Sequence, residues 1–194
     1  MECFSFLRNG SVFRGKQMSE RAEYNVHVTI LHVNLRESML CGYFHIDDDD
    51  EHNLPLLTTY FEAEIIGEKF SFLTKWPEWG ANESIDFRHW KKLGGLDDSI
   101  KNESQMKNYV RREPYKHDLI FMRWKELALF DRPAPGSRLS HAPKAVSYEG
   151  FYYIAFRQST GEITGYYYHN KSNRYEYLEF KPVINKTFPL YEFN

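Results

Sequence analysis

The stretch that decides the fold consists of Gly150-Phe-Tyr-Tyr-Ile-Ala-Phe156 and Ile163-Thr-Gly-Tyr-Tyr-Tyr-His169, with a turn at residues 159–162 between them. Aromatic and β-branched residues favour strands, and a short turn with a glycine between two such runs predicts a β-hairpin. Alternation assigns one set of side chains to one face of the hairpin: Tyr148, Tyr152, Ile154 and Phe156 from the first strand, and Ile163, Gly165 and Tyr167 from the second.

Segments with strand-like patterns occupy most of the remaining chain. They are a short extended opening at 11–15 with a loop at 15–19, and strands at 24–35, 39–46, 57–66, from 118 onward, at 175–181 and at 189–193. In the strand at 24–35 the alternation changes phase after Ile30, which predicts a β-bulge, and Gly42 predicts a bend in the next strand. One face of the strand at 57–66 carries Leu57, Thr59, Phe61, Ala63 and Ile65.

One segment, at about residues 82–117, has a different periodicity. Ser84 is a suitable N-cap for a helix that ends at Gly94-Gly95, and the polar stretch 97–116 predicts at most a second short helix. Sequential antiparallel strands with a short helical insertion indicate an all-β fold, either a lipocalin-like up-and-down β-barrel of about eight strands or a two-sheet sandwich. We favour the barrel, because closure removes strand edges and such a barrel can hold one small ligand in its mouth.

The composition indicates a single domain. The chain has 194 residues, 42% of them hydrophobic, which is enough for one compact domain and gives little support for two. We expect this β-barrel domain at residues 11–194, after a lead-in at residues 1–10. A net charge of −2 gives no basic footprint, so neither nucleic acid nor a membrane is expected as a partner. Cys3 and Cys41 lack redox or metal-ligand spacing and no long apolar run occurs, which favours the cytoplasm or the nucleus.

No pattern in the sequence is typical of a catalytic, cofactor or metal site. A nucleophile elbow, a phosphate loop and a dinucleotide fingerprint are all missing. His27 and His32 fall on opposite faces of one strand unless the bulge intervenes, so zinc is not expected. The acidic run 47–53 lacks the spacing of a calcium loop and is interpreted as a solvated hairpin loop. Glu62 and Glu126 form a glycosidase pair only if the fold brings them together.

Glu126, which ends the segment Phe121-Met-Arg-Trp-Lys-Glu126, is the most informative single residue. Strand alternation places it on the same side as Met122, Trp124 and Ala128, whereas Arg123 and Lys125 lie on the other side and can face water. A carboxylate on an apolar inner face is costly unless a cation pairs with it, which indicates a ligand such as an amine. Alternatively, Glu126 twists outward at the strand end and meets a surface lysine.

Seven segments match a known pattern in order: Ser11-Val-Phe-Arg-Gly-Lys-Gln17, Leu40-Cys-Gly-Tyr43, Leu57-Thr-Thr-Tyr-Phe-Glu62, Phe121-Met-Arg-Trp-Lys-Glu126, Gly150-Phe-Tyr-Tyr153, Gly165-Tyr-Tyr-Tyr-His169 and Tyr191-Glu-Phe193. Together they resemble the vacuolar import and degradation protein family, substrate receptors of the GID/CTLH ubiquitin ligase. The resemblance implies an antiparallel barrel without catalytic activity that binds peptides beginning with a free proline or another apolar residue. It also implies presentation of clients for proteasomal degradation; in fungi the family's clients include gluconeogenic enzymes.

The resemblance implies roles for individual residues. Glu126 aligns with the acid that binds the terminal ammonium of the ligand, Tyr152 with a tyrosine that assists it, and Gln17 with a glutamine that bonds the peptide backbone. Further residues implied to line the peptide site are Ser147, Tyr148, Tyr167, Val26, Ile46, Leu57 and Glu176. The tail at 190–194 is expected to dock in the armadillo-repeat scaffold subunit through Tyr191, Phe193 and Asn194.

Two features depart from the family pattern, and both add negative charge. The run Asp47 to Asp50 stands where an apolar leucine occurs in other members, and Glu176 stands where a glutamine is usual. The resulting hypothesis is a ligand preference for basic residues after the first two or three positions, weakened by salt; the alternative is a solvated acidic loop. Two other functional classes remain: a lipocalin-like carrier of a small amine-bearing or apolar molecule, and an enzyme acting on amines with Tyr152 as proton donor.

Overall fold

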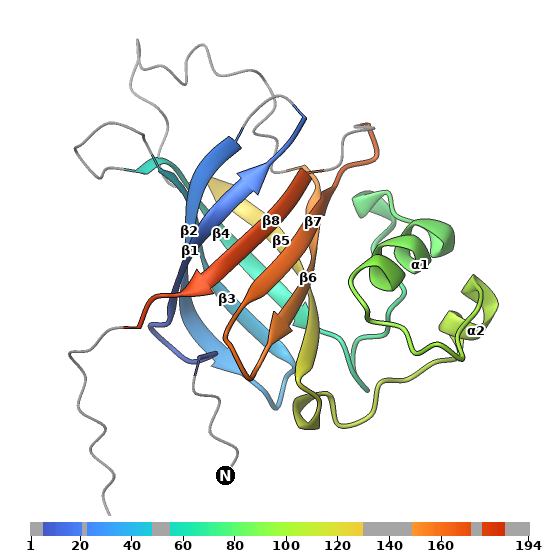
Figure 1. Cartoon of the computed structure of the whole chain (residues 1–194). Helices are drawn as coiled ribbons and strands as arrows, with labels where there is room; N and C mark the ends of the chain where they lie inside the picture. Colours follow the sequence, from blue (N-terminus) through green and yellow to red (C-terminus); the bar gives the residue numbers. More distant parts are fainter. Residues whose placement is uncertain (1–5, 21–22, 48–54, 130–148, 172–175, 185–194) are drawn as a thin grey trace, which may run out of the picture.

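The computed structural model describes residues 6–20, 23–47, 55–129, 149–171 and 176–184, and within them eight strands form a closed barrel (Figure 1). The strands are β1 (Val12–Met18), β2 (Glu23–Asn34), β3 (Met39–Asp47), β4 (Pro55–Ile65), β5 (Leu119–Leu129), β6 (Phe151–Arg157), β7 (Ile163–Tyr168) and β8 (Glu176–Pro182). Each strand runs antiparallel to its neighbours in chain order. The predicted up-and-down barrel is therefore confirmed, and the sandwich is wrong.

The barrel closes where β1 pairs with β8, and a glycine permits this contact. Gly15 lies opposite Phe180 in the β1–β8 ladder. A Cβ atom at Gly15 would lie 1.7 Å from the backbone oxygen of Glu179, so only glycine allows the two strands to approach this closely.

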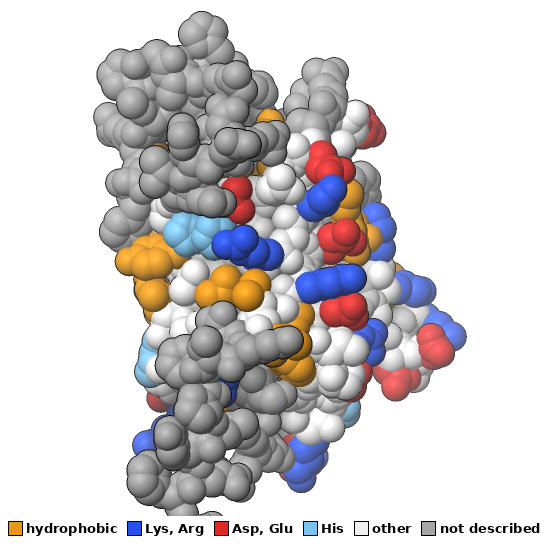
Figure 2. Space-filling view, turned by 60° about the vertical axis from the view of Figure 1, so that its left-hand side comes forward, with side chains coloured by type: hydrophobic (Ala, Val, Ile, Leu, Met, Phe, Trp, Pro, Cys, Tyr) orange, Lys and Arg blue, Asp and Glu red, His pale blue; other side chains and the backbone are white. Residues whose placement is uncertain are grey.

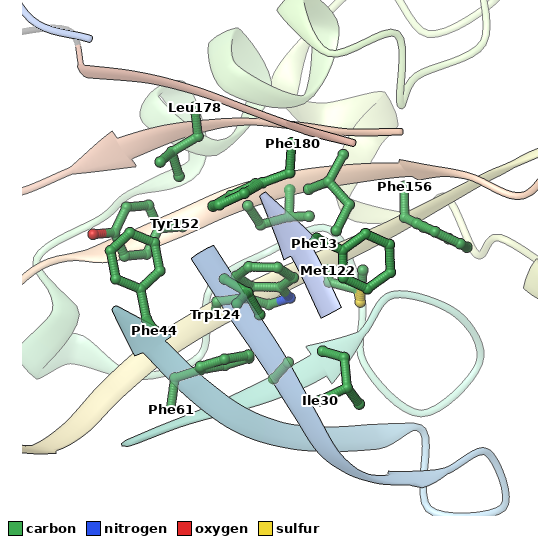
Figure 3. Close-up of a cluster of buried hydrophobic side chains, with 14 of the residues drawn as sticks. Phe13, Ile30, Phe44, Phe61, Met122, Trp124, Tyr152, Phe156, Leu178 and Phe180 are labelled. Atoms are coloured by element: carbon green, nitrogen blue, oxygen red, sulfur yellow. The ribbon is translucent and has the colours of Figure 1, made fainter. Parts of the chain in front are cut away.

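Apolar side chains from all eight strands fill the interior of the barrel (Figure 3). Trp124 and Phe61 stack at 4.7 Å between ring centroids, and Phe44 packs edge-on against Phe180 at 6.1 Å. At one end Leu7 joins this core, and the amide of Gly10 donates to the carbonyl of Ile30 over 2.8 Å. Residues 6–11 therefore pack against that end, and we refer to the opposite end, where β1 finishes and β2 begins, as the rim.

Several local predictions need correction. Strand β1 continues through Met18, so the segment expected as a loop at 15–19 is largely paired with β2 and β8. The predicted bulge after Ile30 is confirmed by a register shift between Ile30 and His32. A second shift, between β4 and β5 at Tyr60, was not predicted; it leaves Ala128 exposed while Leu129 packs against the core. The expected strand at 189–193 and the run 48–50 lie outside the described residues.

The helical insertion covers the outer surface of β5 and β6 (Figure 1). Its helices are η1 (Pro77–Trp79), α1 (Glu83–Lys92), α2 (Glu103–Lys107) and η2 (Pro114–Lys116). Helix α1 is capped by Asn82 rather than the expected Ser84, because the Asn82 side chain accepts the amide of Ile85. It ends before Gly94, whose φ of 74° is the left-handed conformation that glycine adopts at low cost. No helix in the described ranges is long and apolar enough to cross a membrane.

The insertion makes the outer face of β5 a second core, which corrects the expectation that Arg123 faces water. Phe72 packs against Phe121 at 6.0 Å, and Trp90 meets Tyr153 edge-on at 4.9 Å between ring centroids. Arg123 is 1% exposed beneath this layer. Alternation within β5 correctly separates two faces, but it cannot reveal that a distant segment covers the outer one.

The exposed surface carries mixed charge. On the face seen in Figure 2, the described acidic and basic side chains are interspersed rather than separated. Lys16 of β1 pairs with Glu23 of β2, and Arg157 of β6 pairs with Asp118 over 2.8 Å. Such exposed pairs contribute little to stability, so the packing of the two cores is the main source of stabilisation.

Candidate functional site

The inward-facing carboxylate of Glu126 is the centre of the candidate site. Strand β5 directs Met122, Trp124 and Glu126 into the barrel, and Glu126 is 6% exposed near the rim. The interpretation in which this residue twists outward to meet a surface lysine is therefore wrong. The register shift between β4 and β5 places Phe61 opposite Glu126, so a β-bulge lies directly beside the buried carboxylate.

Two hydroxyl groups from neighbouring strands hold the carboxylate. Thr59 of β4 donates a hydrogen bond to Oε1, and Tyr152 of β6 donates to Oε2 over 3.4 Å. Among the described residues, no lysine, arginine or histidine forms an ion pair with Glu126. The site therefore presents a buried carboxylate with hydrogen-bond donors, and the described residues supply no cation in contact with it.

Burial dominates the electrostatics of this carboxylate. Burial raises the pKa of Glu126 above its ordinary value, and the negative charge of Glu176 adds to this increase. The hydrogen bond from Thr59, the positive charge of Lys125 and the hydrogen bond from Tyr152 each lower the pKa and so oppose the increase. Burial likewise raises the pKa of Tyr152 well above its usual range, reinforced by the negative charge of Glu126. The hydroxyl group of Tyr152 therefore keeps its proton at neutral pH and can donate a hydrogen bond.

Aromatic rings enclose Tyr152 beside the carboxylate. Phe44 of β3 lies beside it in Figure 3 and stacks on its ring, with 5.6 Å between the ring centroids. The centroid of the Tyr167 ring of β7 lies 4.9 Å from that of Tyr152. The hydroxyl of Tyr167 accepts the backbone amide of Gly150 over 2.9 Å. A group held at Glu126 therefore meets an apolar, aromatic wall.

Gln17 and Glu176 form a polar pair at the rim. The Gln17 amide nitrogen donates to the Glu176 carboxylate over 2.5 Å, joining β1 to β8 above Leu178. The other amide atom of Gln17, Oε1, is buried and has no hydrogen-bond partner among the described residues. A buried acceptor without a donor favours a ligand N–H at this position.

The remaining predicted site residues divide into two groups. Val26, Ile46 and Leu57 are buried on adjacent strands β2, β3 and β4, where Ile46 pairs with both of the others at the rim end of the barrel. The structure thus brings the described members of the predicted site to one end. Ser147, Tyr148, Tyr191, Phe193 and Asn194 lie outside the described residues.

Two residues of this site were not identified from the sequence as functional. Thr59 was assigned to the inward face of its strand, and a polar residue on an otherwise apolar face was the available signal. Phe44 gave no such signal, because its contact with Tyr152 joins strands that are not neighbours in the barrel.

The geometry also decides between the chemistries considered. Glu62 lies opposite Lys125 in the β4–β5 ladder, on the face of β4 that points away from the barrel interior, so it does not act with Glu126 as a glycosidase pair. Within the described residues, no group of three or more His, Cys, Asp and Glu side chains is arranged to hold a metal ion. The arrangement is suited to binding a cation with an apolar body.

Comparison with known proteins agrees with this architecture. A model of the vacuolar import and degradation protein family matches residues 6–183. The chain is 50% identical over 196 positions to the GID complex substrate-recognition subunit 4 of Schizosaccharomyces pombe, covering 100% of both chains. It is 40% identical over 189 positions to the glucose-induced degradation protein 4 homolog of Mus musculus, covering 97% of this chain and 83% of the mouse protein. The closed barrel and these similarities together establish that the chain belongs to the vacuolar import and degradation protein family.

Proposed function

We propose that this chain is the substrate-recognition subunit of a GID-type ubiquitin ligase and binds the free N-terminal proline, or a similar apolar N-terminus, of client proteins. The observation that carries the proposal is the inward carboxylate of Glu126, held by Thr59 and Tyr152 and without a described cationic partner. The names of the similar fission yeast and mouse proteins support the coarser part of it, the role in a GID complex.

The chemistry of an N-terminal proline fits this carboxylate. Its amine is protonated and has two N–H donors on a compact apolar ring. Glu126 supplies the charge, Tyr152 and Phe44 supply an aromatic wall, and the free oxygen of Gln17 can accept a peptide N–H. Charge-assisted hydrogen bonds of this kind contribute about 1.5–3 kcal/mol each. The receptor role needs no catalytic group in this chain.

The wider assembly belongs to the same proposal. The C-terminal residues Tyr191, Phe193 and Asn194 are assigned to contact an armadillo-repeat scaffold subunit, and the bound client is presented to the catalytic subunits of the ligase. We assign the chain to the cytoplasm or the nucleus, where such clients are met.

Calorimetric titration with a short peptide beginning Pro-Gly, beside the same peptide acetylated at its amine, tests the proposal. The free peptide is expected to bind with micromolar affinity, about −8 kcal/mol. Acetylation removes the positive charge and leaves Glu126 unpaired, at a cost on the order of 2–5 kcal/mol. Equal binding of both peptides contradicts the proposal, and binding of apolar molecules without an amine favours a lipocalin-like carrier instead.

Glu126→Gln provides the matched protein control, because it removes the charge and preserves the shape. The free peptide is expected to lose measurable affinity for this variant, whereas retained binding excludes Glu126 from the site.

A further inference from the structure

The three strands that supply Thr59, Glu126 and Tyr152 are held together on the outside of the barrel by a second set of polar side chains. Strand β4 carries Glu64 in addition to Thr59, β5 carries Arg123, and β6 carries Tyr153. These three outward-facing residues are at most 7% exposed, because the helical insertion covers them. The inner binding groups and the outer polar groups therefore belong to the same three strands.

Arg123 is bonded to its surroundings in three directions. Its Nε donates to Glu64 Oε2 over 2.9 Å, and its two terminal nitrogens donate to the carbonyls of Phe72 over 3.2 Å and Ser71 over 2.9 Å. Ser71 and Phe72 belong to the chain that leads from β4 into the insertion. Arg123 thus joins β4, β5 and the insertion in one fixed arrangement.

Tyr153 joins β6 to the same insertion. Its hydroxyl donates to Asp86 Oδ1 of helix α1 over 2.7 Å, and His89 stacks on its ring at 4.4 Å between centroids. Asp86 also accepts the amide of Thr74 over 2.7 Å and the hydroxyl of Thr74 over 2.7 Å. Burial raises the pKa of Asp86, and these hydrogen bonds oppose that increase.

The register of the sheet connects the two sides of the wall. Arg123 lies directly opposite Tyr153 in the β5–β6 ladder, and the next pair along is Trp124 and Tyr152. The outer pair and the inner pair are consecutive steps of one ladder. A displacement of Tyr153 along or away from β5 therefore moves Tyr152 relative to the carboxylate of Glu126.

We propose that Asp86 and Tyr153 are positioning residues for the proposed N-terminus site, setting the distance between Tyr152 and Glu126 from outside the barrel. This inference rests on the proposed function. Tyr152 lies 3.4 Å from Glu126, near the upper limit for a hydrogen bond, so a displacement well below 1 Å decides whether the bond forms. The insertion, which contributes no described residue to the site, thereby controls its geometry.

Tyr153→Phe tests the inference by removing only the hydroxyl that reaches Asp86. With the Pro-Gly peptide, at a temperature where the variant is fully folded by circular dichroism, we expect affinity to fall about fivefold. The matched control is Tyr115→Phe, which removes a hydroxyl that donates to the Leu35 carbonyl over 3.0 Å, far from the site. Tyr115→Phe is expected to leave affinity unchanged.

The pH dependence of affinity separates positioning from a merely structural role. The hydrogen bond from Tyr152 lowers the pKa of Glu126, so weakening it in Tyr153→Phe is expected to move the acid limb of the binding profile to higher pH. Thr74→Val removes the hydroxyl that donates to Asp86, the partner of Tyr153. It is a milder change than Tyr153→Phe and is expected to give a smaller shift of the acid limb in the same direction. This second variant keeps the test informative if Tyr153→Phe does not fold.

The outcomes distinguish this inference from the proposed function. Wild-type affinity and an unchanged pH profile in a folded Tyr153→Phe or Thr74→Val variant overturn the positioning role while leaving the receptor role intact. Failure of the wild-type protein to bind any free N-terminus overturns both. Loss of affinity with a shifted acid limb, absent in Tyr115→Phe, supports the inference.

Discussion

Tyr152 and Tyr153 are consecutive residues whose hydroxyl groups bond to carboxylates on opposite sides of the barrel wall. Tyr152 donates inward to Glu126 over 3.4 Å, and Tyr153 donates outward to Asp86 over 2.7 Å. Because strand side chains alternate, one dipeptide anchors β6 both to the candidate site and to the helical insertion. The polar groups of this wall therefore connect the candidate site on the inside with the packed insertion on the outside.

The first prediction is that Glu126→Gln increases the stability of the ligand-free protein while abolishing binding. Burial raises the pKa of Glu126 in the folded state above the value of 4.5 for an exposed glutamate. Between these two pKa values the folded state holds more protons than the unfolded state, so the free energy of unfolding falls as pH rises through this window. Glu126→Gln has no carboxyl group to titrate at this position, so its free energy of unfolding does not fall in this way, and it is the more stable protein at neutral pH and above.

Thermal unfolding at several pH values measures the effect. We expect the Tm of Glu126→Gln to exceed that of the wild type by about 2–4 °C at neutral pH, the shift that ~1 kcal/mol produces in a domain of this size. The difference is expected to vanish below the pKa of an exposed glutamate. Glu179→Gln, an exposed carboxylate of β8, serves as the control and is expected to leave Tm unchanged. A lower Tm for Glu126→Gln at neutral pH contradicts the argument.

The second prediction concerns the pH dependence of binding to a peptide with a free N-terminal proline. The ionised carboxylate binds the ammonium group, so affinity is expected to rise with pH through the raised pKa of Glu126 in the free protein. It is expected to fall again once the amine of the peptide loses its proton. Titration calorimetry between about pH 5 and about pH 9 gives the profile; affinity that does not vary across this range is incompatible with a Glu126–ammonium contact.

The third prediction is a preference for peptides with a basic residue shortly after the N-terminus. Glu176 of β8 supplies a second carboxylate at the rim in addition to Glu126, and it accepts a hydrogen bond from the side-chain amide of Gln17 over 2.5 Å. A lysine at the third peptide position is expected to bind about fivefold more tightly than a glutamate, less so at high salt.

Glu176→Gln is expected to reduce this ratio toward one and to leave affinity for a neutral peptide within about twofold. Glu179→Gln makes the same charge change on the outer surface of the same strand, so it is the matched control and is expected to keep the ratio. An equal response of the two variants assigns the effect to net charge and excludes a specific role for Glu176.

The fourth prediction is that Gly15→Ala destabilises the closure of the barrel. The added methyl group would lie 1.7 Å from the backbone oxygen of Glu179, so β1 and β8 must separate. We expect a loss of about 1–3 kcal/mol, or ~3–10 °C in Tm. Gly94→Ala is the control for glycine substitution without a clash, because no atom lies within 4 Å of its Cβ position, although its φ of 74° adds some strain. A Tm of Gly15→Ala at or above that of Gly94→Ala contradicts this role of β1–β8 closure.

The sequence was sufficient for the local periodicity of the barrel. Alternation in the strand containing Tyr152 and in its hairpin partner, and the phase change after Ile30, correspond to the observed strands and bulge. Alternation also favoured an inward-facing Glu126 in β5, but an outward twist at the strand end was excluded only by its burial in the structure. These features are encoded by near neighbours in the chain, because the side-chain period of a strand is a property of the backbone itself.

Only the tertiary structure decided which faces are covered and which side chains meet. Arg123 reads as an exposed residue in the sequence, yet it is buried because residues 71–92 return over β5 and β6. Thr59, Glu126 and Tyr152 come from three strands, and the sequence gives no register between them. Local periodicity assigns a side chain to a face, but its environment depends on long-range packing, which is why the carboxylate was predictable and its partner Thr59 was not.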